Sequence, residues 1–306
     1  MQPLSKCVAI LVLAGVWACT PAADQSRELK VDGIPVRIEL ADAEFKDGAE
    51  PLLTWIRRSA DIVTRYYGRF PTRELRLVVQ PVDGGGVRGG QTFGREGGFI
   101  RIRVGRSVTD AQLVDDWVLV HEMIHLALPD VGEDHSWLSE GISTYVEGIA
   151  RAQAGNRTIE DVWTEQMNSM PKGLPQPGDR GLDNTHTWGR TYWGGALFCL
   201  EADVEIHRRT QNRFGLQDAL RAVAQASGGI VADWPVERVF STGDKAVGGH
   251  VLEDLYAKMK DAPMAPDLPA LWHQLGVEEQ DQSIRLHDDA PLADVRKAIM
   301  RPRAGS

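Results

Sequence analysis

Two histidines four residues apart, His121 and His125, stand within an apolar segment as the pentapeptide H-E-M-I-H. Residues four apart lie on the same face of an α-helix, so a helix here points both imidazoles to one side. Apolar residues at helical spacing surround the pair: Leu113, Val114, Trp117, Val118, Val120, Leu126, Ala127 and Leu128. We therefore predict one largely buried helix over residues 111–128, which Pro129 ends. Because buried polar groups without partners are costly, this helix has to fold around a polar or metal-binding centre.

Glu140 lies in a second predicted helix, which begins at Ser136 after a short connection over residues 129–135. A short connection favours two antiparallel helices side by side, which brings Glu140 to the histidine pair. Two imidazoles and one carboxylate are typical ligands of a catalytic Zn²⁺, and a Glu beside the first His serves as general base. The pattern predicts one Zn²⁺ per chain, held by His121, His125 and Glu140, with Glu122 as the base.

These two segments, H-E-M-I-H and W-L-S-E-G-I-S-T-Y-V-E, resemble the gluzincin zinc metallopeptidases. A later segment, Thr191–Ile206, is similar to the Y-x-x-G-x-x-x-x-x-x-L-D helix of the glycyl aminopeptidase family. Tyr192, Gly195 and Asp203 match that helix, while Ala202 stands where the family has Leu. The resemblance implies a thermolysin-like catalytic domain that hydrolyses peptide or protein substrates. It also implies that the Tyr192 hydroxyl stabilises the oxyanion formed at the scissile carbonyl.

The chain departs from the better-known gluzincins in two places. Fourteen residues, 126–139, separate His125 from Glu140, fewer than in aminopeptidase N or thermolysin. The G-x-M-E-N strand, with which aminopeptidase N proteins hold a free N-terminal amine, is missing. The sequence therefore leaves both endopeptidase and aminopeptidase action open.

Each assigned residue also has a purely structural interpretation. His121 and His125 can be hydrogen-bonded core residues, Glu140 a surface acid and Tyr192 a packed aromatic. Glu147 lies two helical turns after Glu140 on the same face, where it either orients a ligand imidazole or is simply solvated. For the whole protein, the alternative to a peptidase is a degenerate peptidase fold that acts as an envelope binding or scaffold lipoprotein. The intact Glu122 favours catalysis, since a non-catalytic copy is free to lose it.

The remaining pattern predicts an α+β chain, with a small mixed sheet followed by a mostly helical lobe and the zinc in the cleft between them. Strands are expected at Ser26–Asp32, Ile34–Leu40, Leu75–Gln80 and Phe99–Val104, and helices at Glu50–Tyr67, Ala270–Gly276 and Ala290–Met300. Residues Met170–Asn184 are expected to form a loop near the mouth of the active site. We place an N-terminal α/β subdomain at 26–110, and the zinc-binding helices with the helical lobe at 111–306.

The alternating strand F-I-R-I-R-V precedes the histidine helix. By resemblance to thermolysin-like folds it is expected to border the cleft and pair with the substrate backbone, through Ile100, Arg101 and Ile102. The glycine-rich stretch before it, Asp83–Gly98, is either a flap over the cleft or a flexible hairpin.

The N-terminus indicates export. Residues 7–18 are uncharged and mostly apolar, which is typical of a signal peptide and too short to span a bilayer. V-W-A-C at the end of this run resembles a bacterial lipobox with an acylated Cys19, and the competing interpretation is cleavage near Ala22 or Ala23. We expect a periplasmic, outer-membrane or secreted protein, which meets a membrane only through such an anchor.

Composition excludes several classes. A net charge of −9 disfavours nucleic acid and anionic membrane surfaces as partners. With only Cys199 beyond the signal region, the mature chain has no disulfide framework, and this cysteine is best read as a small buried hydrophobe.

Overall fold

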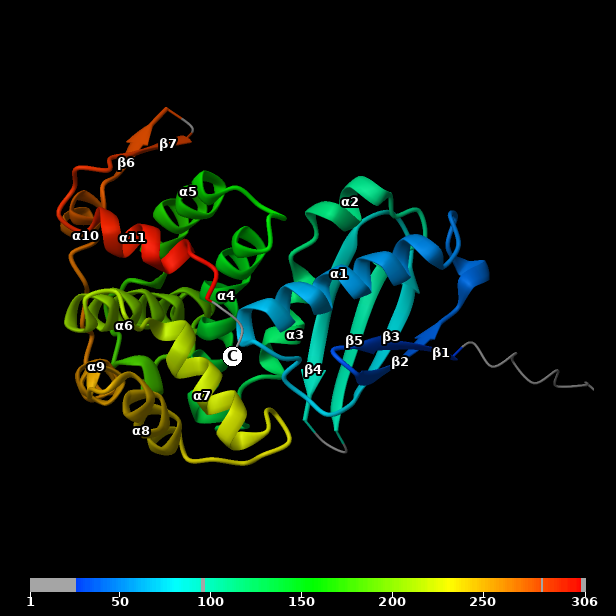
Figure 1. Cartoon of the computed structure of the whole chain (residues 1–306), viewed down its shortest axis with the longest axis horizontal. Coiled ribbons are helices and arrows are strands. Elements are labelled where there is room, and N and C mark those ends of the chain that lie inside the picture. The colour runs from blue at the N-terminus through cyan, green and yellow to red at the C-terminus, as the bar shows by residue number, and fades with distance from the viewer. Residues whose placement is uncertain (1–25, 95–96, 282, 304–306) are drawn as a thin grey trace, which may run out of the picture.

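The computed structural model of the chain describes residues 26–94, 97–281 and 283–303. The predicted signal segment, with Cys19, Ala22 and Ala23, lies outside the described residues. Figure 1 shows a twisted sheet backed by α1 (Glu50–Tyr67) and a separate lobe of helices, with α3 (Val118–His125) and α4 (Ser136–Gln153) between them. This arrangement confirms the predicted α+β class. Within the described ranges, no helix has both the length and the apolar character needed to cross a membrane.

The sheet has five strands in the order β1-β2-β3-β5-β4. Their bounds are β1 Ser26–Val31, β2 Ile34–Leu40, β3 Leu75–Val82, β4 Val87–Phe93 and β5 Gly98–Gly105. β1 and β2 form an antiparallel hairpin, and its turn residues Asp32 and Gly33 have φ values of 51° and 76°, the positive φ that a type I′ turn requires. β2, β3 and β5 run parallel, whereas β4 is antiparallel to β5 and forms one edge. The sheet is therefore mixed, as predicted.

The predicted substrate edge is wrong. Residues 99–104 belong to β5, which pairs with β3 on one side and with β4 on the other. Ile100 and Ile102 are fully buried, and the Arg101 guanidinium lies over the rings of Phe93 and Phe99. The edge on this side of the sheet is β4, formed by the stretch that was expected to be a flap or a flexible hairpin. Its glycines give no alternation of apolar and polar side chains, so the sequence pattern did not reveal the strand. The strand forms nevertheless, because an edge strand needs only backbone hydrogen bonds to one neighbouring strand.

The single helix predicted over residues 111–128 is two helices, α2 (Asp110–Asp115) and α3. The break lies at Asp116, which has extended backbone angles. Its carboxylate accepts hydrogen bonds from the backbone N–H groups of Val118 and Leu119, each at 3.1 Å, and from the Trp55 indole at 3.0 Å. Asp116 thus caps α3 at its free N–H groups, and the apolar periodicity concealed this cap.

The lobe consists of eight α-helices, with α4 and α6 packed against each other. They are α4, α5 (Ile159–Ser169), α6 (Gly195–Thr210), α7 (Leu216–Ser227), α8 (Val236–Val247), α9 (Val251–Met259), α10 (Leu268–Leu275) and α11 (Ala293–Met300). Two 3₁₀ turns, Met170–Gly173 and Leu182–Asn184, lie in the predicted loop, and a hairpin of β6 (Val277–Gln280) and β7 (Ser283–Leu286) was not expected. Cys199 is buried in α6, as predicted.

The backbones of α4 and α6 touch where Gly141 meets Gly195. A Cβ on Gly195 would lie 2.7 Å from the Gly141 Cα and would overlap the Trp137 carbonyl. These glycines belong to the E-G and Y-x-x-G sequence patterns. Glycine is needed at both positions because the two helix backbones leave no room for a side chain between them. The contact brings Glu140, the neighbour of Gly141, toward Tyr192, which precedes Gly195 by three residues.

We expect Gly195→Ala to lower the free energy of unfolding by about 1–3 kcal/mol, because the added methyl overpacks this contact. Gly249→Ala is the matched control, since the atom nearest to a Cβ there is a Val251 methyl at 4.0 Å. The control should change stability by about 0.5 kcal/mol or less. Urea unfolding measures both, and equal effects would contradict a packing role for the glycine contact.

Candidate metal centre

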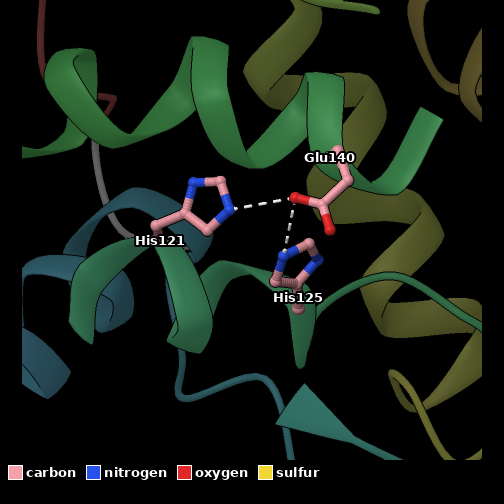
Figure 2. A group of neighbouring side chains, drawn as sticks. All are labelled: His121, His125 and Glu140. Carbon is pink, nitrogen blue, oxygen red and sulfur yellow. Dashed lines mark hydrogen bonds and ion pairs between the residues drawn. The ribbon is translucent and has the colours of Figure 1, made fainter. Parts of the chain in front are cut away.

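His121, His125 and Glu140 converge between α3 and α4 (Figure 2). The Glu140 Oε2 lies 3.2 Å from the His121 Nε2 and 3.5 Å from the His125 Nε2. One atom from each residue can be chosen so that all three lie within 4.8 Å of one another. The structure therefore brings together the three ligands that the sequence predicted.

Hydrogen bonds and burial give these groups the protonation states that a cation needs. The His125 Nδ1 lies 2.8 Å from the Ser139 Oγ, which leaves its Nε2 for the centre. Burial lowers the pKa of His121 and favours the neutral ring. Burial alone would raise the pKa of Glu140, but hydrogen bonds from the two imidazoles outweigh it and hold the pKa well below its usual range. Neutral imidazoles beside an ionised carboxylate fit a divalent metal ion.

Glu122 lies under the edge strand β4, beside the three ligands. The Thr92 hydroxyl is 2.6 Å from the Glu122 Oε2 and 2.9 Å from the Glu122 carbonyl oxygen, so it donates to one or the other. A Cβ at Gly90 would lie only 2.6 Å from the Glu122 Cγ. The sequence analysis did not identify Gly90 or Thr92 as site residues. The only sequence feature that could have indicated them is their position shortly before a predicted strand.

Tyr192 lies in a π-helical turn, Gly189–Gly194, directly before α6. Its ring stacks on His121, with 6.3 Å between centroids, and its hydroxyl interacts with the nearby Glu140 carboxylate. Burial and the nearby carboxylates Glu140 and Glu122 raise the pKa of Tyr192 to about 12, so the phenol stays protonated and can donate. The predicted catalytic tyrosine thus lies at the same centre as the predicted ligands.

A buried ion pair holds the π-helical turn in place. The Arg190 Nε lies 2.7 Å from the Asp179 Oδ2, and the Arg190 Nη1 donates to the Gly173 carbonyl at 2.7 Å. Both charged side chains are almost fully buried. Nothing in the sequence pattern pointed to this pair, because Asp179 lies in the irregular segment between the two 3₁₀ turns.

Glu147 does not orient a ligand imidazole. Its carboxylate accepts a hydrogen bond from Arg151 at 2.9 Å, one turn further along α4. Arg151 also donates to the Asn156 side chain and to the Asp115 carbonyl. Burial raises the pKa of Glu147 to about 7, with Arg151 opposing the shift. Glu147 does share a face of α4 with Glu140, but the buried Arg151 on the same helix is the hydrogen-bond partner of its carboxylate.

The centre opens into a cleft of about 1200 Å³. One wall is the second half of β4 with the residue after it, Gly90 to Gly94, and the opposite walls are the segments 128–133 and 230–233. Glu122, both histidines, Glu140 and Tyr192 all line it. The cleft places an exposed strand edge, the Glu122 carboxylate, a protonated phenol and a candidate metal-binding set around one space.

Comparison with solved structures identifies the fold. An aminopeptidase N family protein from Idiomarina loihiensis aligns with a TM-score of 0.59 and 12% identity, over 82% of this chain and 49% of that one. An M1 zinc metallopeptidase from Deinococcus radiodurans aligns with a TM-score of 0.50 and 14% identity, over 80% and 53%. The chain therefore spans about half the length of these proteins. No protein-family model matches it, and no curated protein does either. The likeness establishes a fold similar to the catalytic domain of M1 zinc metallopeptidases.

We expect Ser139→Ala to weaken binding of Zn²⁺ about 10–100-fold, because His125 loses the partner that orients its ring. Ser143, one turn further along α4, is the matched control, since its buried hydroxyl has no hydrogen-bond partner among the described residues. Ser143→Ala should therefore leave the affinity unchanged. Calorimetric titration of metal-free protein measures both. An unchanged affinity in Ser139→Ala would show that the hydroxyl does not support the ligand.

Proposed function

We propose that the chain is a zinc-dependent peptidase that hydrolyses peptide bonds. The observation that carries this proposal is the convergence of His121, His125 and Glu140 in one cleft with Glu122 and Tyr192. A ligand set alone would also suit a structural metal site. Structural sites are closed, however, whereas this set faces a large cleft beside a carboxylate that is not a ligand.

Two imidazoles and one carboxylate suit Zn²⁺, which when bound would lower the pKa of a water molecule to about 7 and polarise the scissile carbonyl. Glu122 takes the proton of the attacking water and later passes it to the leaving amine. Thr92 keeps the Glu122 carboxylate turned toward the cleft through its hydrogen bond. The protonated Tyr192 hydroxyl donates to the oxyanion that forms on the carbonyl oxygen.

The substrate backbone lies along β4, whose outer side pairs with no other strand of the part of the chain that the structure describes. An extended peptide can pair with such an edge through main-chain hydrogen bonds. We propose that it runs antiparallel to β4, with the scissile bond beside Gly90 and Glu122. The glycine there lets the peptide and the base approach the strand closely.

We also propose that the chain is related more closely to the glycyl aminopeptidase family than to aminopeptidase N. It is supported by the segment that carries Tyr192, Gly195 and Asp203, and by the absence of G-x-M-E-N from the edge strand. The alternative, a binding or scaffold protein with a degenerate peptidase fold, is weakened because both Glu122 and Tyr192 are retained.

We expect Glu122→Gln to abolish peptide hydrolysis while zinc content and folding stay intact, because glutamine keeps the shape but takes no proton. Tyr192→Phe should lower kcat about 10²–10³-fold with little change in KM, since its donor acts mainly in the transition state. Steady-state kinetics on a peptide library, with metal analysis of each variant, provide the measurement. Wild-type rates in both variants would contradict their assigned roles, and a zinc-loaded wild type that cleaves no peptide would favour the binding protein.

We also propose that the protein is exported and acylated at Cys19, on the strength of V-W-A-C after the apolar run. Expression in a bacterium with a palmitate analogue should label the wild type but not Cys19→Ser. A soluble, unlabelled product that begins near Ala22 or Ala23 would instead indicate ordinary signal-peptidase cleavage.

A further inference from the structure

The solvent-facing side of the five-stranded sheet carries several arginines side by side. Along β2, β3 and β5, buried side chains alternate with exposed or partly exposed ones, and the buried ones lie on the side that α1 backs in Figure 1. On the opposite side, the strand register places Arg37 beside Arg76 and Arg76 beside Phe99. Arg101 and Arg103 occupy the next two outward positions of β5. Cross-strand partners share a face of a sheet, so these side chains form one surface.

This surface is basic, although the chain as a whole is acidic. Glu39 is paired with Arg76, with 2.7 Å between the Glu39 Oε1 and the Arg76 Nε, and Glu28 lies opposite Arg37 in the register. Five basic side chains against these two acids leave a net charge of +3, in a chain whose net charge is −9. We call this surface the cationic face: Lys30, Arg37, Arg76, Arg101 and Arg103, with Glu28, Glu39, Phe93 and Phe99.

The net charge of the chain conceals this face. A surface contact depends on the charges within about one Debye length, which is about 8 Å at physiological salt. Neighbouring strands lie about 4.8 Å apart, so an anionic surface laid on the sheet meets several guanidinium groups at once. The local charge of the face therefore outweighs the dispersed acids elsewhere on the molecule.

The aromatic rings of the face favour a membrane over nucleic acid. The Arg76 guanidinium lies 5.2 Å from the centre of the Phe99 ring and the Arg101 guanidinium 5.9 Å from it, so this ring is not open to stack on a base. Sheets that bind single-stranded nucleic acid need such open rings. The neighbouring Phe93 is 39% exposed, and an exposed apolar ring among basic groups is typical of surfaces that lie in a lipid headgroup layer.

The proposed lipid anchor supports the same partner. Ser26, the first residue of β1, is the seventh residue after Cys19. A chain spans at most about 3.6 Å per residue, so an acyl group on Cys19 would keep the bilayer within about 25 Å of the sheet. A single acyl chain binds a membrane only weakly and reversibly, and a basic surface is a common second contact.

We propose that the cationic face binds the anionic headgroups of a lipid bilayer, with its guanidinium groups on the lipid phosphates and the Phe93 ring at the level of the headgroups. This inference is independent of the proposed peptidase function. It also goes beyond membrane contact through an N-terminal anchor alone, because the folded domain itself lies on the bilayer.

Vesicle binding tests the face without the anchor. The full chain carrying Cys19→Ser is titrated with vesicles of phosphatidylcholine, and with vesicles of phosphatidylcholine and phosphatidylglycerol in equal parts. It should prefer the anionic vesicles, and about 1 M NaCl should remove the preference by screening. Adding Arg37→Gln and Arg101→Gln together should weaken binding to the anionic vesicles about 10–30-fold, roughly 5-fold for each charge lost.

Arg57→Gln with Arg65→Gln is the matched control, because these exposed arginines lie on α1, on the other side of the sheet, and the net charge changes by the same amount. The control should keep the preference. The N-terminal apolar run is identical in every variant, so a difference between variants reports the face.

Three results would overturn the inference. The first is equal binding of the Cys19→Ser chain to both kinds of vesicle, and the second is an equal loss in the two double variants. The third is a labelled single-stranded oligonucleotide that binds more tightly than the anionic vesicles and depends on Arg37 and Arg101, which would assign the face to nucleic acid. Circular dichroism of each variant checks that the fold is retained.

Discussion

The proposed active site depends on the direct contact between the backbones of α4 and α6 at Gly141 and Gly195. Side chains usually hold packed helices 8–10 Å apart at their axes, and two facing glycines remove that spacer. Glu140 comes from the first helix and Tyr192 from the turn before the second, so the approach brings a candidate metal ligand and the proposed proton donor together. Any larger residue would push them apart before it touched the site itself.

Burial and hydrogen bonds then set the protonation states of these groups. The imidazole of His121 is favoured as neutral, Glu140 stays ionised through its hydrogen bonds, and the phenol of Tyr192 keeps its proton. Each protonation state is the one that the proposed role of the group requires. The neighbours that favour it lie on other helices: the histidines of α3 act on Glu140, and Glu140 and Glu122 act on Tyr192. The ion pair of Arg190 with Asp179 lies just behind, where it holds the π-helical turn rather than taking part in the reaction.

The edge strand β4 shows how a functional element can be hidden from sequence analysis. Its glycines allow close approach to Glu122 and leave backbone groups open to a peptide, and the same glycines erase the side-chain alternation that marks a strand. The neighbouring β5 alternates cleanly because both of its edges are paired and one of its faces is buried. The clearest strand signal therefore pointed to the wrong strand.

The sequence by itself determined the α+β class and the candidate ligand set His121, His125 and Glu140, with Glu122 beside it as the proposed base. The class follows from the order of the strand and helix patterns, and the candidate set from helical spacing and ligand chemistry within short segments. Its periodicity also located α1 and most of the sheet. The tertiary structure decided which strand is the edge, where Asp116 divides the histidine helix, and that Arg151 rather than an imidazole pairs with Glu147. It also decided that Thr92 and Ser139 reach the centre. These outcomes depend on contacts between segments that are distant in the sequence, and local secondary-structure propensity does not predict which segments come into contact.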